Sequence, residues 1–154
     1  MIALYKGRSF PSRVIRVFNW SDYSHAAWVD DDDDSVIEAW QKGGVSHVAN
    51  ISINHTPGTD VDLFAVTGET PEIRAAVREL LRSQVGKGYD FLGILGFVCR
   101  APILQRRSKW FCSELIAEAY SYAGHQLIRL PSYKIYPGML AASPMLRHTG
   151  GTRT

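Results

Sequence analysis

The sequence predicts an α+β protein in which an antiparallel sheet of five or six strands packs against helices. Two observations carry this prediction. Segments rich in β-branched and aromatic residues fill the first half of the chain, and segments with helical spacing fill the second half. Strands grouped apart from helices are typical of the α+β class. The 154 residues suit one domain, which we expect to span positions 1–154.

Composition excludes several classes of protein. The chain is 45% hydrophobic and 21% charged, as in an ordinary globular domain, and its net charge of +2 is too small to indicate nucleic-acid binding. The longest uncharged apolar run, 91–99, is far shorter than the about 20 residues of a membrane-spanning helix. No basic segment followed by a long apolar stretch opens the chain. We therefore expect a cytoplasmic location by default, and later export by another route is left open.

Five strands are expected before residue 70, separated by Gly, Pro, Asn and Asp. The short separations favour antiparallel neighbours, because antiparallel strands can be joined by tight turns. The expected strands span 14–18, 25–29, 35–40, 48–53 and 61–66.

The second half predicts helices. Thr70 is suited to cap a helix that begins at Pro71, and Gly86 is suited to end it. The remaining expected elements are a short helix over 89–98, a helix over 111–123, one or two helical turns over 138–143 and a frayed end over 150–154.

Cys112 lies where the helical pattern of 111–123 begins. At a helix N-terminus, the positive end of the helix dipole and the free backbone N–H groups favour the thiolate, which is the nucleophilic form. The same N–H groups can hold an oxyanion. A free cysteine is more often a small buried hydrophobic residue, so position alone favours a structural role for Cys112.

His25 and Glu38 lie on two neighbouring expected strands, with the acidic run 30–34 between them. If the strands form a hairpin that turns around 31–33, two registers place both side chains on one face, either directly opposite or diagonal. A register between these two places them on opposite faces. Glu38 can then fix the tautomer of His25 and leave its other nitrogen as a base. A structural hydrogen-bonded pair, or a Glu38 that faces water, fits the spacing equally well.

Together, Cys112, His25 and Glu38 are the parts of a thiol nucleophile system. In such a system the base holds the thiolate, the carboxylate orients the base, and helix N–H groups stabilise the tetrahedral intermediate. The order of the three residues along the chain is no objection, because such triads are defined by geometry.

Four segments also carry a family resemblance. They are Tyr-Ser-His25-Ala-Ala-Trp-Val, Val-Ile-Glu38-Ala-Trp, Gly-Lys-Gly-Tyr89-Asp90-Phe and Trp-Phe-Cys112-Ser-Glu-Leu-Ile-Ala-Glu-Ala. In this order they resemble the NlpC-type papain-like hydrolases, specifically the circularly permuted YiiX/YaeF-like group, whose His strands precede the nucleophile helix. The resemblance implies a papain-like fold with Cys112 as nucleophile, His25 as base and Glu38 as the third polar residue. It also implies that Tyr89 lies near the oxyanion or the substrate.

The expected reaction is thiol hydrolysis of an amide bond in a peptide, such as a peptidoglycan stem peptide, through an acyl-thioester on Cys112. Two alternatives stay open: an acyltransferase or lipid-amide hydrolase on the same residues, and a non-catalytic binding or structural module that keeps the fold. This chemistry needs no metal ion and no organic cofactor. The expected partner is a peptide or acyl-amide substrate and not a nucleic acid, and association with a cell wall or membrane surface is left open.

Two further polar groupings are expected to have no chemical role. His47 and His55 could bind zinc with Cys112 or His25, but they show no recognised metal-binding spacing and are expected to be surface or core histidines. The acidic run 30–34 is expected to form a solvated loop, because contiguous carboxylates in a tight turn converge poorly on one ion.

Overall fold

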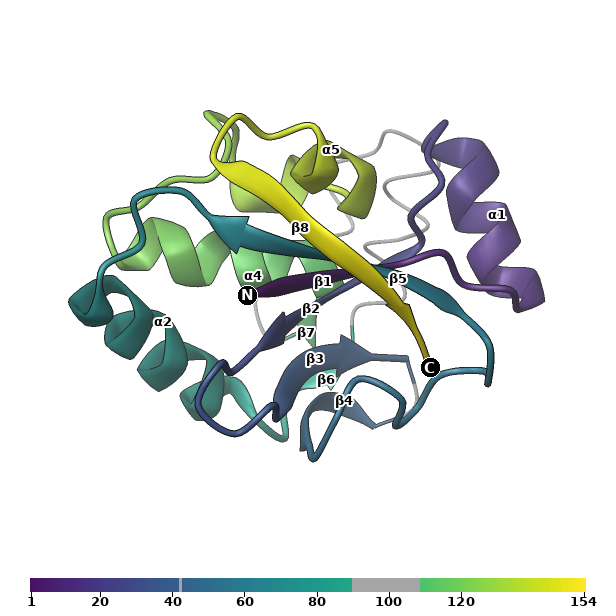
Figure 1. Ribbon diagram of the computed structural model, residues 1–154, viewed down its shortest axis with the longest axis horizontal. Coiled ribbons are helices and arrows are strands. Elements are labelled where there is room, and N and C mark those ends of the chain that lie inside the picture. The colour runs from purple at the N-terminus through teal and green to yellow at the C-terminus, as the bar shows by residue number, and fades with distance from the viewer. Residues whose placement is uncertain (42, 90–108) are drawn as a thin grey trace.

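The computed structural model describes residues 1–41, 43–89 and 109–154 (Figure 1). These residues form the predicted α+β fold, in which a six-stranded antiparallel sheet packs against helices. Apart from Tyr89, the short helix expected over 89–98 lies outside the described residues.

The sheet has the strand order β4-β3-β2-β1-β5-β8, so the first strand of the chain lies inside the sheet and β4 and β8 lie at its edges. Each strand runs antiparallel to its neighbours. The strands are β1 Ile2–Tyr5, β2 His25–Val29, β3 Val36–Trp40, β4 Gly44–Val48, β5 Asp60–Val66 and β8 Leu146–Arg153. A second, parallel pair joins β6 Gly88–Tyr89 to β7 Lys109–Trp110.

Helices α4 and α2 bury one face of the sheet. Helix α4 packs on β2 and β3, α2 lies against α4, and the apolar side chains of both helices join those of the sheet in the main core. The Thr70 side chain accepts a hydrogen bond from the Ile73 N–H at 3.3 Å and caps α2, as predicted. The helices are α1 Phe10–Phe18, α2 Pro71–Gln84, α4 Cys112–Tyr122 and α5 Pro137–Ala141, with a 3₁₀ turn, η2, at Ser132–Lys134.

The strand predicted over 14–18 is wrong, because this segment is the second half of α1. The Ser9 side chain accepts a hydrogen bond from the Ser12 N–H at 3.4 Å, and Pro11 stands in the first turn of the helix. These start signals outweigh the strand preference of the β-branched residues that follow.

Three further differences concern strands. The strand predicted over 48–53 is also wrong, because β4 ends at Val48 and turns follow it. Strand β1 is not among the predicted elements. The tail at 150–154, expected to fray, pairs instead with β5 as part of β8, through residue 153.

The β2–β3 hairpin sets the positions of His25 and Glu38. Trp28 pairs with Ile37 and Val29 pairs with Val36. This is the expected register in which His25 and Glu38 are diagonal neighbours on one face. Trp28 and Ile37 therefore face the helix-covered core, and residues of the other parity face the smaller core on the opposite side of the sheet. His25 and Glu38 belong to this second face.

The acidic run 30–34 forms a turn whose last four residues are exposed, as predicted, but its first carboxylate is not solvated. Asp30 is only 2% exposed and accepts a hydrogen bond from Arg78 of α2 at 2.5 Å. Asp31 binds Arg74 at 2.6 Å and the N-terminal ammonium of the chain at 2.8 Å. The carboxylates therefore fasten α2 to the turn between β2 and β3.

Candidate active site

Glu38 is the centre of a buried hydrogen-bond cluster. This residue is 1% exposed, and its Oε2 lies 2.6 Å from His25 Nε2 and 3.1 Å from His55 Nε2. Its Oε1 accepts a hydrogen bond from Asn54 Nδ2 at 3.0 Å. An ionised carboxylate can only accept hydrogen bonds, so in this arrangement both histidines carry a proton on Nε2.

Burial and the mutual contacts of the cluster shift the pKa values of Glu38, His25 and His55 in different directions. Burial alone would raise the pKa of Glu38, but the hydrogen bonds and charges of His25 and His55 hold that pKa well below its usual range. Burial alone would lower the pKa of His25, but the Cys112 sulfur and Glu38 outweigh it and raise this pKa to about 10. Burial and the charge of His25 lower the pKa of His55, against the pull of Glu38. At neutral pH this gives a carboxylate, an imidazolium at His25 and a neutral His55.

Cys112 is the first residue of α4 and is 1% exposed. Its sulfur lies close enough to the His25 ring to interact with it electrostatically and to raise the pKa of His25. Because Nε2 of His25 is bound to Glu38, Nδ1 is the nitrogen left to face the sulfur. The first-turn N–H groups of a helix have no acceptor within it, so those of α4 lie beside the thiol.

The start of α4 is held from two sides. The buried Ser113 hydroxyl donates to the Ile135 carbonyl oxygen at 2.6 Å, which ties the helix to the segment after η2. The Glu114 side chain accepts a hydrogen bond from the Phe111 N–H at 3.3 Å. These contacts fix the position of the thiol relative to the sheet.

The thiol and the imidazole come from opposite faces of the sheet. Cys112 belongs to the helix-covered core, whereas strand alternation places His25 and Glu38 on the other face. His25 is the first residue of β2, so its ring lies at one end of that strand, and there it interacts with the sulfur. The structure thus brings Cys112, His25 and Glu38 into one chain of contacts.

His55 and Asn54 are members of this cluster that the sequence does not predict. They follow β4 in a turn-rich loop, and Asn54 has a positive φ of 71°. The ring of Tyr5 stacks on His55 at a centroid distance of 3.8 Å, and Trp40 meets His55 edge-on at 4.8 Å. The segment that contains them has no helical or strand periodicity. An amide residue next to a histidine is the sequence feature that could have indicated a polar site here.

Tyr89 lies in β6, where its backbone pairs with that of Trp110. Its side chain lies outside the described part of the structure, so its expected place near an oxyanion stays a prediction.

His25, Glu38 and His55 also offer metal-ligand atoms within 4.8 Å of one another. Two imidazoles and a carboxylate are a donor set that zinc takes in proteins. Two atoms bound to one tetrahedral zinc at about 2.0–2.1 Å lie roughly 3.3 Å apart. The 2.6 Å between His25 Nε2 and Glu38 Oε2 is instead a direct hydrogen bond, so the donor types fit a metal and the side chains would have to separate to bind one.

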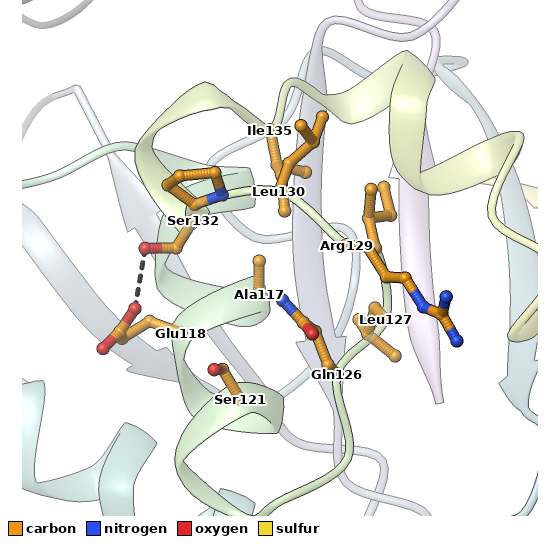
Figure 2. A pocket seen from close by; sticks show the side chains of 11 residues that line it. Ala117, Glu118, Ser121, Gln126, Leu127, Arg129, Leu130, Ser132 and Ile135 are labelled. Atoms are coloured by element: carbon orange, nitrogen blue, oxygen red, sulfur yellow. Dashed lines mark hydrogen bonds between the residues drawn. The ribbon is translucent and has the colours of Figure 1, made fainter.

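A hollow of about 580 Å³ lies beside α4, away from this cluster. Figure 2 shows Glu118 and Ser132 at one side of it, joined by a hydrogen bond of 2.6 Å. Ile135, whose carbonyl oxygen accepts from Ser113, also lines it. None of its lining residues is Cys112, His25 or Glu38, so the hollow is separate from the candidate active site.

Comparison with known proteins supports the fold. No protein-family model matches the sequence, and no curated protein matches it. Among solved structures, the chain is similar to the metalloprotein YiiX from Escherichia coli O157:H7, with a TM-score of 0.70 and 18% sequence identity. The alignment covers 97% of this chain and 94% of YiiX. The chain therefore has a YiiX-like fold over nearly its whole length. Within the described ranges, no helix has the length and apolar character needed to cross a bilayer.

Proposed function

We propose that the protein is a thiol hydrolase that cleaves an amide bond in a peptide, such as a peptidoglycan stem peptide. One observation carries the proposal: His25 is held between the Glu38 carboxylate, 2.6 Å from its Nε2, and the Cys112 sulfur at the start of α4. A buried imidazole with a carboxylate on one side and a thiol on the other is the arrangement that nucleophilic catalysis by cysteine requires.

In the first half of the proposed reaction, the Cys112 thiolate attacks the amide carbonyl carbon and a C–S bond forms. The carbonyl oxygen becomes an oxyanion, which the first-turn N–H groups of α4, and in our proposal Tyr89, stabilise. The imidazolium of His25 then gives its Nδ1 proton to the amide nitrogen as the C–N bond breaks. The products of this half are a free amine and an acyl-thioester on Cys112.

In the second half, His25 is neutral and takes a proton from a water molecule as that water attacks the thioester carbon. Collapse of the second tetrahedral intermediate breaks the C–S bond, releases the carboxylic acid and restores the thiolate. If another nucleophile replaces water, the same residues transfer the acyl group, which is the acyltransferase alternative.

Alkylation of Cys112 by iodoacetamide, measured by mass spectrometry against pH, tests the proposed pair. Cys99 is an internal reference within the same chain. We expect Cys112 to react faster than Cys99 at each pH, because a neighbouring imidazolium favours the reactive thiolate, and the variant His25→Ala to react more slowly. If Cys112 matches Cys99 and ignores His25→Ala, the proposal is wrong and a binding module is favoured.

Turnover of stem peptides and of acyl-amides by the wild-type protein and by Cys112→Ser identifies the substrate class. Hydrolysis of stem peptides that Cys112→Ser abolishes supports the peptidase. Turnover of acyl-amides alone supports the lipid-directed alternative.

A second candidate is a metal-dependent protein, because YiiX is called a metalloprotein and His25, Glu38 and His55 are suitable donors. Metal analysis of the purified protein, compared with that of His55→Ala, separates the two candidates. A thiol hydrolase keeps its activity in chelator and loses it in Cys112→Ser. A metal-dependent protein loses one bound ion in His55→Ala, loses its activity in chelator and keeps it in Cys112→Ser.

A further inference from the structure

Helix α1 turns apolar side chains away from the protein. None of its residues is buried, although Phe10, Val14 and Phe18 follow one another at four-residue spacing along one face. Phe10 is 80% exposed, Val17 72% and Phe18 55%. An amphipathic helix normally buries such a face against its own core, so this face is free to meet something else.

The turn after α1 continues this surface. Trp20 has a positive φ of 47° and is 97% exposed. An open hollow of about 660 Å³ lies beside it, lined by Arg13, Arg16, Val17, Trp20, Ser21 and Asp22. Exposed aromatic side chains therefore stand next to guanidinium groups.

The charge of this segment is strongly positive. Residues 6–24 carry four basic side chains and one acidic one, a net charge of +3 against +2 for the whole chain. Arg16 is paired with Asp22 at 3.4 Å, whereas Arg13 has no carboxylate partner in the part of the chain that the structure describes. The surface therefore suits an anionic partner and disfavours a second copy of itself.

Its position relates it to the candidate active site. Tyr5, the last residue of β1, pairs with His25, the first residue of β2. The segment that contains α1 connects these two residues, so both of its ends lie beside His25. Figure 1 shows α1 at the periphery of the molecule, on the side opposite α2. The segment that carries α1 is therefore joined directly to the strand that begins with His25.

We propose that α1 and Trp20 bind the surface of an anionic lipid bilayer. The exposed aromatic and aliphatic side chains would enter the boundary between headgroups and acyl chains, where tryptophan is favoured. Arg13 and Arg16 would meet lipid phosphates in the hollow beside Trp20. The helix would lie in the plane of the surface. This inference does not depend on the chemistry of Cys112.

Sedimentation with vesicles of phosphatidylcholine, alone and mixed equally with phosphatidylglycerol, tests the proposal on the full chain. We expect binding to the mixed vesicles that added salt weakens, with a shift of Trp20 fluorescence to shorter wavelength that Trp20→Phe removes. Arg13→Gln should weaken binding about fivefold, the effect of one basic residue at an anionic surface. Trp20→Ser should weaken it at least about tenfold.

Matched controls come from another surface. Tyr122 is 67% exposed on α4, and Arg129 is exposed beside the other hollow. Tyr122→Ser and Arg129→Gln should bind as the wild type does, and so should Cys112→Ala. The proposal is overturned if the mixed vesicles do not bind, if the control variants weaken binding as much, or if α1 instead mediates a dimer that Trp20→Ser dissolves.

Discussion

Replacement of Glu38 by glutamine tests the buried cluster, because it removes one charge and almost no volume. The carboxylate of Glu38 accepts three hydrogen bonds, from His25, His55 and Asn54. A glutamine keeps one acceptor oxygen and presents two N–H donors in place of the other. If that oxygen faces the two histidines, the new donors face the Asn54 amide, and His25 loses its negative partner.

Breaking a buried ion pair by removing one partner costs about 3–5 kcal/mol. We expect Glu38→Gln to lower the free energy of unfolding by about 3 kcal/mol near pH 6. The pKa of His25 is raised from 6.5 to about 10. The contribution of its charge to the free energy of unfolding is therefore complete below pH 6.5 and is lost as the pH rises through 10. The lowered pKa of Glu38 makes its contribution present above pH 4.5 and lost as the pH falls. The difference between wild type and variant should therefore be largest between pH 4.5 and 6.5.

Urea unfolding followed by tryptophan fluorescence at pH 5.5, 7.5 and 9.5 measures this difference. Glu79→Gln is the matched control, because Glu79 is exposed on α2, and it should change stability by less than about 0.5 kcal/mol. A Glu38→Gln protein as stable as the wild type at pH 5.5, or a difference that grows toward pH 9.5, would refute the ionic description of the cluster.

Substitutions at Arg78, Gly44 and Thr70 test how the fold is held together. Arg78→Met should lower the free energy of unfolding by about 2–4 kcal/mol in urea, because Asp30 is 2% exposed and loses its closest partner; an unchanged stability would contradict the buried network. Gly44→Ala should cost more than about 2 kcal/mol in the same assay, since its φ is +79° and a Cβ would lie 2.0 Å from a carbonyl oxygen. Gly150→Ala, with nothing within 4 Å, should be silent, and equal effects would contradict this reasoning. Thr70→Ala should lower stability by about 1 kcal/mol in thermal unfolding, and Thr70→Ser should restore it.

Local rules predict the part of the candidate site that depends on one hairpin and one helix start. The side-chain period of two limits the registers that bring His25 and Glu38 to one face, and the structure adopts one of them. The apolar spacing after Cys112 predicts a helix, and α4 begins at that residue. Each of these inferences needs information from only a few neighbouring positions.

The parts that the sequence does not predict depend on contacts between distant segments. His55 reaches Glu38 through a loop whose course is set by Tyr5 stacking and by turns, and neither leaves a periodic pattern. The segment 14–18 has β-branched residues that favour a strand, and only its cap and proline indicate a helix. Strand β8 contains glycines and polar residues, and it is a strand because β5 offers it hydrogen bonds.

The strand order has a consequence for how the protein acquires its site during folding. The hairpin that holds His25 and Glu38 closes through a short turn, so it can form early. Cys112 comes from the last third of the chain and reaches His25 only when α4 docks on β2 and β3. Contacts of such long sequence separation form slowly. The enhanced reactivity expected of Cys112 should therefore arise late in refolding. The rate of alkylation of this thiol during refolding would then report when α4 docks on the sheet.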